Sequence, residues 1–223
     1  MSSAVGTHGV IGDLETLALV GEQATLEWFC WPRFDSPSIF GSLLDDDGGY
    51  WSIAPSAEGA LSRQMYVPDT NVLLTRYHID EAIVEVQDCM AIGGDDRGIV
   101  RSVRCVRGES TLVSEMLVRP DYGRETADLD HGDGGVLISF GDTELRLATA
   151  LPGERSDECD ISDQVIRITF ELQEGEEAAF SLTDASCPPM ASDVVQHTIA
   201  YWRNWISQSN YTGRWRETVD RSA

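Results

Sequence analysis

Short apolar runs separated by turn residues dominate the sequence from Tyr50 to Thr183, and no segment there has the pattern of a long helix. Runs of this kind, bounded by Gly and Asp, are typical of β-strands. The predicted strands are Tyr50–Ile53, Arg63–Val67, Val72–Ile79, Ile83–Ala91, Ile99–Val106, Thr111–Val118, Val136–Phe140, Glu144–Thr149, Val165–Leu172 and Ala178–Thr183.

Most breaks between these runs are as tight as hairpin turns, for example Asp80–Glu81, Gly108–Glu109 and Gly141–Asp142. Tight turns join antiparallel neighbours. So many strands must form two packed sheets or a closed barrel, because one open sheet would leave a face and its edges exposed. We predict a large antiparallel β-sandwich, since no repeat of fixed period favours a propeller.

The buried side of the predicted strand Ile99–Val106 cannot be assigned, because polar and apolar residues occur on both of its faces. These faces are Val100–Ser102–Arg104 and Arg101–Val103–Cys105.

A strand pair is predicted near the amino terminus, at Thr16–Val20 and Thr25–Phe29. Pro32 ends the second strand because proline has no amide proton to give to a sheet. A loop follows. Ser36–Pro37 then predicts a helix start, because serine caps free amides and proline suits the first turn. The apolar face of that helix would be Ile39, Phe40, Leu43 and Leu44.

The loop after this strand contains Trp31, Arg33, Phe34 and Asp35. Aromatic faces stack on the C–H surface of sugar rings, and Arg and Asp pair with hydroxyl groups, so these residues suit sugar binding. The other interpretation is that Trp31 and Phe34 are core residues and that Arg33 and Asp35 form a pair that stabilises the turn. The residue types alone leave both open.

The periodicity changes after Cys187–Pro188–Pro189. Apolar residues then recur at steps of three and four, which predicts an amphipathic helix over Ser192–Ser207, capped by Ser192 or Asp193. A second helix is predicted to start near Gly213. The first helix presents Trp202 and Trp205, which either pack on the sandwich or form an interface.

The chain has 38 acidic and 16 basic residues, for a formal charge of −22. Such a charge repels nucleic acid and anionic membranes, whereas neutral sugars are not repelled. No apolar run is long enough to span a bilayer, and Met1–Val10 lacks the features of a signal peptide. We therefore expect no nucleic-acid or membrane partner and a cytoplasmic location.

No catalytic or metal-binding motif is visible. The five cysteines and four histidines are scattered, without the spacing of ligand pairs. Asp45–Asp46–Asp47 is predicted to be a solvated turn. Asp157, Glu158, Asp160 and Asp163 could hold a cation, but an acidic loop is the simpler interpretation. We predict no catalytic residue, no metal site and no cofactor in this chain.

The amino-terminal stretch resembles a specific family. It contains Ile11-Gly-Asp, then Glu27-Trp-Phe-Cys and the hexapeptide Pro32-Arg-Phe-Asp-Ser-Pro, followed by Phe40 and Gly48–Gly49. These motifs are similar to those of the amino-terminal domain of bacterial and archaeal glycoside hydrolase family 15. That family includes glucoamylases, glucodextranases and trehalases. The segment from Tyr201-Trp-Arg-Asn-Trp to Tyr211-Thr-Gly-Arg-Trp resembles the family's linker helix and first barrel helix. In this sequence Trp31 directly precedes the proline, unlike the commonest family pattern.

The resemblance implies a supersandwich-like β domain over residues 1–190, with residues 191–223 as the linker helix and the start of a truncated (α/α)6 barrel. The two catalytic glutamates of the family lie in the barrel and map onto no position here. The chain would then be a non-catalytic part of an inverting α-glucoside hydrolase. By the resemblance, Trp31, Arg33, Phe34 and Asp35 would help to bind an α-glucoside or trehalose at the mouth of the missing barrel. The alternative is an independent carbohydrate-binding module. Without the barrel, Trp202, Trp205 and Trp215 predict self-association through the carboxy-terminal helices.

Overall fold

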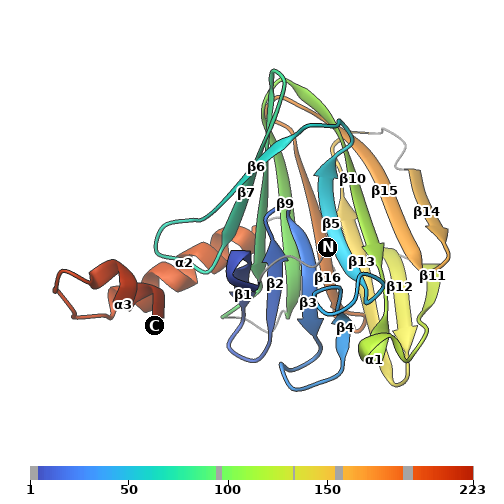
Figure 1. Cartoon of the computed structure of the whole chain (residues 1–223), viewed down its shortest axis with the longest axis horizontal. Coiled ribbons are helices and arrows are strands. Elements are labelled where there is room, and N and C mark those ends of the chain that lie inside the picture. Colours follow the sequence, from blue (N-terminus) through green and yellow to red (C-terminus); the bar gives the residue numbers. More distant parts are fainter. Residues whose placement is uncertain (1–4, 94–96, 133, 154–157, 188–192, 223) are drawn as a thin grey trace.

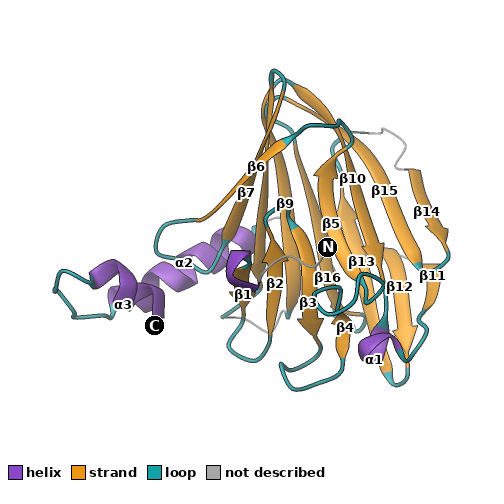
Figure 2. Cartoon of the chain, viewed as in Figure 1, coloured by secondary structure: helices purple, strands orange, loops and turns teal. Residues whose placement is uncertain are grey.

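The computed structural model describes residues 5–93, 97–132, 134–153, 158–187 and 193–222. Within them the chain is mostly antiparallel β-structure, and the helices lie mainly at the carboxy-terminal end (Figures 1 and 2). The strands are β1 Gly9–Gly12, β2 Leu17–Gly21, β3 Thr25–Cys30, β4 Ser38–Phe40, β5 Tyr50–Pro55, β6 Leu61–Tyr66, β7 Leu73–Ile79, β8 Ala82–Met90, β9 Gly98–Arg107, β10 Glu109–Leu117, β11 Asp128–Gly132, β12 Gly135–Phe140, β13 Thr143–Ala150, β14 Glu158–Ser162, β15 Val165–Gln173 and β16 Glu177–Asp184. The helical segments are η1 Val5–Thr7, the short turn α1 Pro120–Gly123, α2 Val194–Ser207 and α3 Arg216–Ser222.

The strands form two eight-stranded sheets. The first sheet has the order β1-β2-β3-β5-β10-β15-β14, with β4 also paired to β3. The second has the order β11-β12-β13-β16-β9-β8-β7-β6. The sheets pack face to face around one apolar core that includes Phe29, Phe40, Trp51, Val103 and Phe180. The predicted β-sandwich is therefore confirmed.

A buried ion pair connects the two sheets through this core. Arg101 on β9 and Asp88 on β8 are fully buried, with 2.7 Å between Arg101 Nε and Asp88 Oδ1. The Arg101 guanidinium also donates to the carbonyl oxygens of Trp51 on β5 and of Ala24 in the β2–β3 turn, both of which belong to the first-sheet side. It lies 4.9 Å from the centre of the Trp51 ring.

Helix α2 covers the outer face of the second sheet. Its Val194, Val195 and Ile199 form a separate apolar cluster with residues of the sheet. The other residues of this cluster are Cys89 on β8, Val100 on β9, and Val72 and Ala91, which directly flank β7 and β8. Val100 therefore faces α2 while Arg101 faces the other sheet, which explains why both faces of the predicted strand Ile99–Val106 contain apolar residues.

The helix predicted from Ser36–Pro37 is wrong. Ser38, Ile39 and Phe40 form the short strand β4, in which all three residues are buried and Phe40 lies opposite Phe29. Turns follow through the Asp45–Gly49 region, where the amide of Asp47 donates to Asp45 Oδ1 at 3.0 Å. Burial on both sides of the backbone, rather than helical amphipathicity, accounts for Ile39 and Phe40, whereas Leu44 is 71% exposed.

The strands missed by the sequence pattern are short. β1, β11 and β14 each lie at the edge of a sheet. An edge strand is paired on one side only, and β11 is largely exposed, so its sequence needs few apolar residues.

The carboxy-terminal helices fall close to the predicted positions, at Val194–Ser207 and Arg216–Ser222. Asp193 occupies the N-cap position of α2 without a capping hydrogen bond from its side chain. The other predicted cap, Ser192, and the predicted boundary at residues 190–191 lie outside the described residues. Among the helices that the structure describes, none is long and apolar enough to cross a membrane.

Candidate functional site

The β3–β4 loop places the predicted sugar-binding residues at two depths. Trp31 is buried, with 8% of its surface exposed, and its ring centre lies 6.0 Å from that of Phe29 in the core. The Trp31–Pro32 peptide bond is cis. Phe34, in contrast, is 62% exposed. The core interpretation therefore fits Trp31 but not Phe34.

Arg33 and Asp35 form the pair that the second interpretation predicted. Arg33 Nε donates to Asp35 Oδ1 at 3.1 Å, and both side chains are 60% exposed. The turn is further fixed by the amide of Arg33, which donates to Ser36 Oγ at 3.2 Å. The loop thus presents an aromatic ring, a guanidinium and a carboxylate to solvent.

Arg97, just before β9, ties this loop to a second one and was not singled out in the sequence. Its Nη2 donates to the carbonyl oxygen of Pro32 at 3.1 Å and lies 2.9 Å from Glu15 Oε2. Its guanidinium carbon lies 5.5 Å from the centre of the Trp31 ring. The amide of Phe34 donates to the carbonyl oxygen of Glu15 at 3.1 Å. Arg97 and Glu15 therefore hold the loop that carries Phe34.

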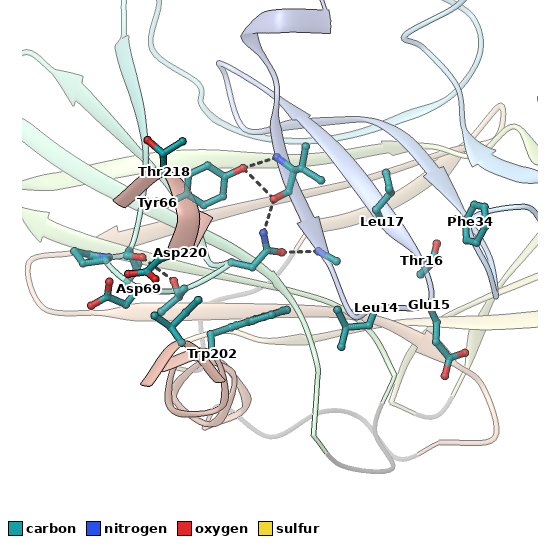
Figure 3. Close-up of a pocket in the computed structure, with 17 residues that line it drawn as sticks. Leu14, Glu15, Thr16, Leu17, Phe34, Tyr66, Asp69, Trp202, Thr218 and Asp220 are labelled. Carbon is teal, nitrogen blue, oxygen red and sulfur yellow. Dashed lines mark hydrogen bonds between the residues drawn. The ribbon is translucent and has the colours of Figure 1, made fainter. Parts of the chain in front are cut away.

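A cavity of about 1020 Å³ lies beside this loop (Figure 3). It is bounded by the β1–β2 segment, the β6–β7 turn, α2, α3 and Phe34. Figure 3 shows Leu14 and Glu15 on one side of it and Asp69 and Asp220 on another. Sequence reasoning missed this cavity because its walls come from segments far apart in the chain.

The polar groups at the β1 side of the cavity are already paired with backbone. Tyr66 OH donates to the Val10 carbonyl oxygen at 3.0 Å and accepts from the Val10 amide at 2.7 Å. The Asn71 side-chain oxygen accepts from the Gly12 amide at 2.8 Å. These bonds hold the β6–β7 turn against edge strand β1 and so fix the shape of this wall.

Asp88 and Cys89, which lie outside the loop and the cavity, are titratable groups buried inside the protein. Burial raises the pKa of Asp88, although Arg101 opposes that shift. Burial beneath α2 raises the pKa of the Cys89 thiol to about 12. Among the described residues, no group of three or more His, Cys, Asp or Glu side chains is placed to hold a metal ion. Of the predicted acidic group, Asp157 lies outside the described residues.

Comparison with known proteins gives a consistent family. Residues 2–156 match the family described as "Trehalase-like, N-terminal". A trehalase from Mycobacterium tuberculosis is 26% identical over 252 aligned positions, which include 98% of this chain and 36% of the relative. A trehalase from Mycolicibacterium smegmatis is 27% identical, and 98% of this chain aligns with 37% of it. The chain thus spans little more than a third of the length of these relatives.

The fold has a counterpart among solved structures. A bacterial glucoamylase, whose crystal structure was determined in complex with acarbose, matches with a TM-score of 0.59 and 7% sequence identity. That match covers 100% of this chain and 40% of the glucoamylase. An identity this low indicates a shared fold alone. Together with the trehalase relatives, the fold supports the resemblance to the amino-terminal domain of family 15 enzymes. The chain belongs to the trehalase-like N-terminal domain family.

Proposed function

We propose that this chain is the non-catalytic amino-terminal part of an inverting α-glucoside hydrolase of the trehalase or glucoamylase type. In this proposal, residues 1–190 are the β-sandwich domain, and residues 191–223 are the linker helix and the start of an (α/α)6 catalytic barrel. The family match over residues 2–156 supports it most directly. The carboxylates that glycoside hydrolysis needs would lie in the barrel.

The β3–β4 loop would help to shape the substrate site. Arg33, Phe34 and Asp35 are exposed and can offer hydrogen bonds and a stacking face to a sugar. Trp31, which is buried beneath the loop, would support it from the core side. The partners would be an α-glucoside or trehalose substrate and the barrel. The acidic surface argues against nucleic acid and anionic membranes, and we propose a cytoplasmic location.

Activity of the isolated chain tests the non-catalytic assignment. We expect the purified 223-residue chain to release no glucose from trehalose, maltose, isomaltose or dextran, because the proposal places the catalytic acids in the barrel. Robust glucose release that copurifies with the chain would refute the proposal.

The role of the loop can be tested in a chimaera in which this chain replaces the aligned part of the Mycolicibacterium smegmatis trehalase. Arg33→Ala should raise the KM for trehalose by roughly tenfold, as expected for loss of a hydrogen bond from a charged group. Arg63→Ala, which removes an exposed arginine from β6, is the matched control. Equal KM values for the two variants would argue against a role for the loop.

An independent carbohydrate-binding module remains the second candidate, because the exposed groups of the loop would suit it. Calorimetric titration with malto- and isomalto-oligosaccharides separates the two. We expect dissociation constants no tighter than about millimolar, because most of a complete site would be missing. A micromolar constant would favour the module.

A further inference from the structure

Strand β6 is an open edge of the second sheet (Figure 1). It pairs with β7 in continuous register, and just past it the amide of Val67 donates to the Val72 carbonyl oxygen at 2.9 Å. Because hydrogen-bonded pairs alternate along an antiparallel ladder, the backbone amides and carbonyls of Ser62 and Gln64 point away from β7. For residues 61–65, no described segment other than β7 supplies a backbone hydrogen bond. This edge can therefore accept a further strand.

A row of charged side chains crosses the outer face of the sheet and ends at β6 with an unbalanced arginine. From β16 inward, Glu177 lies opposite Arg104, and Arg104 lies opposite Glu85. Glu85 in turn accepts from Arg76 Nε at 2.8 Å. The next residue of the row is Arg63, directly opposite Arg76, so two like charges meet. Arg63 is exposed, and its side chain has no partner within the described chain.

Apolar side chains flank Arg63 on the same face of β6. Leu61 and Met65 lie two residues to either side of it and are 72% and 44% exposed. An added strand with a carboxylate opposite Arg63 would continue the alternation of charge, and apolar side chains two residues away would cover the flanking pair. A strand with a cation at that place would add a third like charge to the row.

We propose that the β6 edge binds an extended acidic segment of another protein by strand addition. The segment has an acidic residue between two apolar residues at alternate positions. Its backbone pairs with Ser62 and Gln64, and its carboxylate pairs with Arg63. At physiological ionic strength charges beyond about 8 Å are largely screened, so the net negative charge of the chain leaves this local attraction in place.

The same arginine selects against a second copy of this chain. Pairing of two β6 edges would bring one Arg63–Arg76 pair beside another. A charge on an edge strand ordinarily prevents such self-pairing. Here it also discriminates between partners, because only a strand of opposite charge relieves the repulsion between the two arginines.

The test measures amide hydrogen exchange of the ¹⁵N-labelled chain with the capped peptide Thr-Val-Thr-Glu-Thr-Val-Thr as the probe. Exchange at Ser62 and Gln64 should slow as the peptide is added, with a dissociation constant of about millimolar. The amides of β11, at the other edge of the sheet, should not change, because Asp128 and Asp130 repel the peptide. The same peptide with arginine in place of glutamate should protect neither edge strand's Ser62 nor Gln64.

Three outcomes of this titration would overturn the proposal. The first is unchanged exchange at Ser62 and Gln64 at about tenfold above millimolar peptide. The second is equal protection by the acidic and the basic peptide. The third is protection that rises with the concentration of the chain alone, which would assign the edge to a second copy.

Charge reversal on the strand gives a sharper arm. Arg63→Glu should weaken binding of the acidic peptide at least about tenfold and should create binding of the arginine peptide. The control is Arg107→Ala, which removes an exposed arginine from the interior strand β9 and should leave binding of the acidic peptide unchanged. Equal effects of the two substitutions would contradict the proposal.

A proline at the edge tests the backbone pairing. Ser62→Pro removes an amide that points away from β7, so the sheet should persist while binding of the acidic peptide is lost. Near-ultraviolet circular dichroism checks the fold. A folded Ser62→Pro variant that binds the peptide as the unchanged chain does would contradict strand addition, and Arg63→Glu decides the question if the proline variant does not fold.

This inference does not rest on the proposed function. The β6 edge and the β3–β4 loop share no residue. The trehalose assay of the chimaera contains no peptide, so Arg63→Ala remains a suitable control there, and either proposal can fail while the other stands.

Discussion

At the scale of single residues, the Asp88–Arg101 pair is the most costly group to disturb. Both side chains are fully buried, and the guanidinium reaches carbonyl oxygens of the opposite sheet. Removing one member of such a pair leaves a charge in the core without compensation. The pair therefore fixes how the two sheets are placed as much as it stabilises them.

Arg101→Met should lower the free energy of unfolding by about 3–5 kcal/mol, because Asp88 then remains buried and unpaired. Urea unfolding at neutral pH measures the loss. The exposed pair gives the control, since Arg33→Ala should cost less than about 1 kcal/mol. Burial raises the folded-state pKa of Asp88, so protonation favours the folded state of the variant and the deficit should shrink toward about pH 4. A deficit that does not depend on pH would contradict this account.

Tyr50 gives a prediction at alkaline pH. Its hydroxyl donates to Glu115 Oε1, and burial together with this carboxylate raises the pKa of Tyr50 to about 12. The neutral phenol is thus favoured in the folded state, so its stabilising effect is complete below about pH 10 and is lost as the pH rises through about 12. Ultraviolet titration should show a late tyrosinate transition that is absent in Tyr50→Phe. An unchanged curve in the variant would assign that transition to another tyrosine.

At the scale of elements, the central strands were predictable and the segments at the ends of the sandwich were not. Apart from edge strand β11, the strands of the second sheet alternate or run apolar over many residues, so their positions follow from local pattern. The stretch Ile39–Leu44 misled because its apolar residues fit a helical spacing, although both sides of β4 are covered. The local sequence does not show that segments distant in the chain will bury both sides of a strand.

The residues of the candidate site were likewise predictable only in part. The hexapeptide drew attention to the loop, and the Arg33–Asp35 pair was one of the two interpretations that its residue types allowed, whereas the structure alone showed that Phe34 is exposed and Trp31 is buried. Arg97 lies in a Gly- and Asp-rich turn that predicts only a hairpin, and its partners Glu15 and Pro32 are distant in sequence. Trp202 was predicted either to pack on the sandwich or to form an interface, and the pattern could not indicate that its Nε1 would lack a partner among the described residues.

Arg97→Ala should loosen the β3–β4 loop. Losing a charge-assisted hydrogen bond to Pro32 and the contact with Glu15 should speed tryptic cleavage after Arg33 by roughly tenfold, through more frequent local opening. Mass spectrometry of timed digests locates the cut. The cleavage rate of Arg97→Lys should lie between those of the unchanged chain and of Arg97→Ala, because lysine keeps the charge without the planar donor set.

The control for this digestion is Arg104→Ala, which removes an exposed arginine from β9 itself. If both alanine variants are cut after Arg33 at the same rate, Arg97 does not specifically stabilise the β3–β4 loop.

At the scale of the whole molecule, a large acidic charge coexists with an exposed aromatic surface. Trp205, Trp215 and Val219 are 39%, 57% and 38% exposed on α2 and in the α3 region. Apolar surface of this kind normally finds a partner. The formal charge of −22 opposes contact between two copies, but salt screens this repulsion and leaves apolar burial intact.

We therefore expect the isolated chain to dimerise more strongly as salt rises, as measured by light scattering. The double variant Trp205→Ser/Trp215→Ser should remain monomeric. Deleting the entire tail is a poor control, because it would uncover Val72, Cys89 and Val100 beneath α2. A monomer at every salt concentration would show that the tail needs no second copy.

The strand order also bears on how the chain folds while it is being synthesised. β9 pairs with β8 on one side and with β16 on the other, and its outer face is covered by α2. β10 likewise stays unpaired on one side until β15 has been synthesised. A nascent chain that has not yet reached Glu177 must therefore hold the open edges of β9 and β13 unpaired, a state in which edge-to-edge aggregation competes with folding. Almost the whole sandwich must therefore be synthesised before both sheets are complete, so the early strands keep open edges until β16 and α2 have emerged.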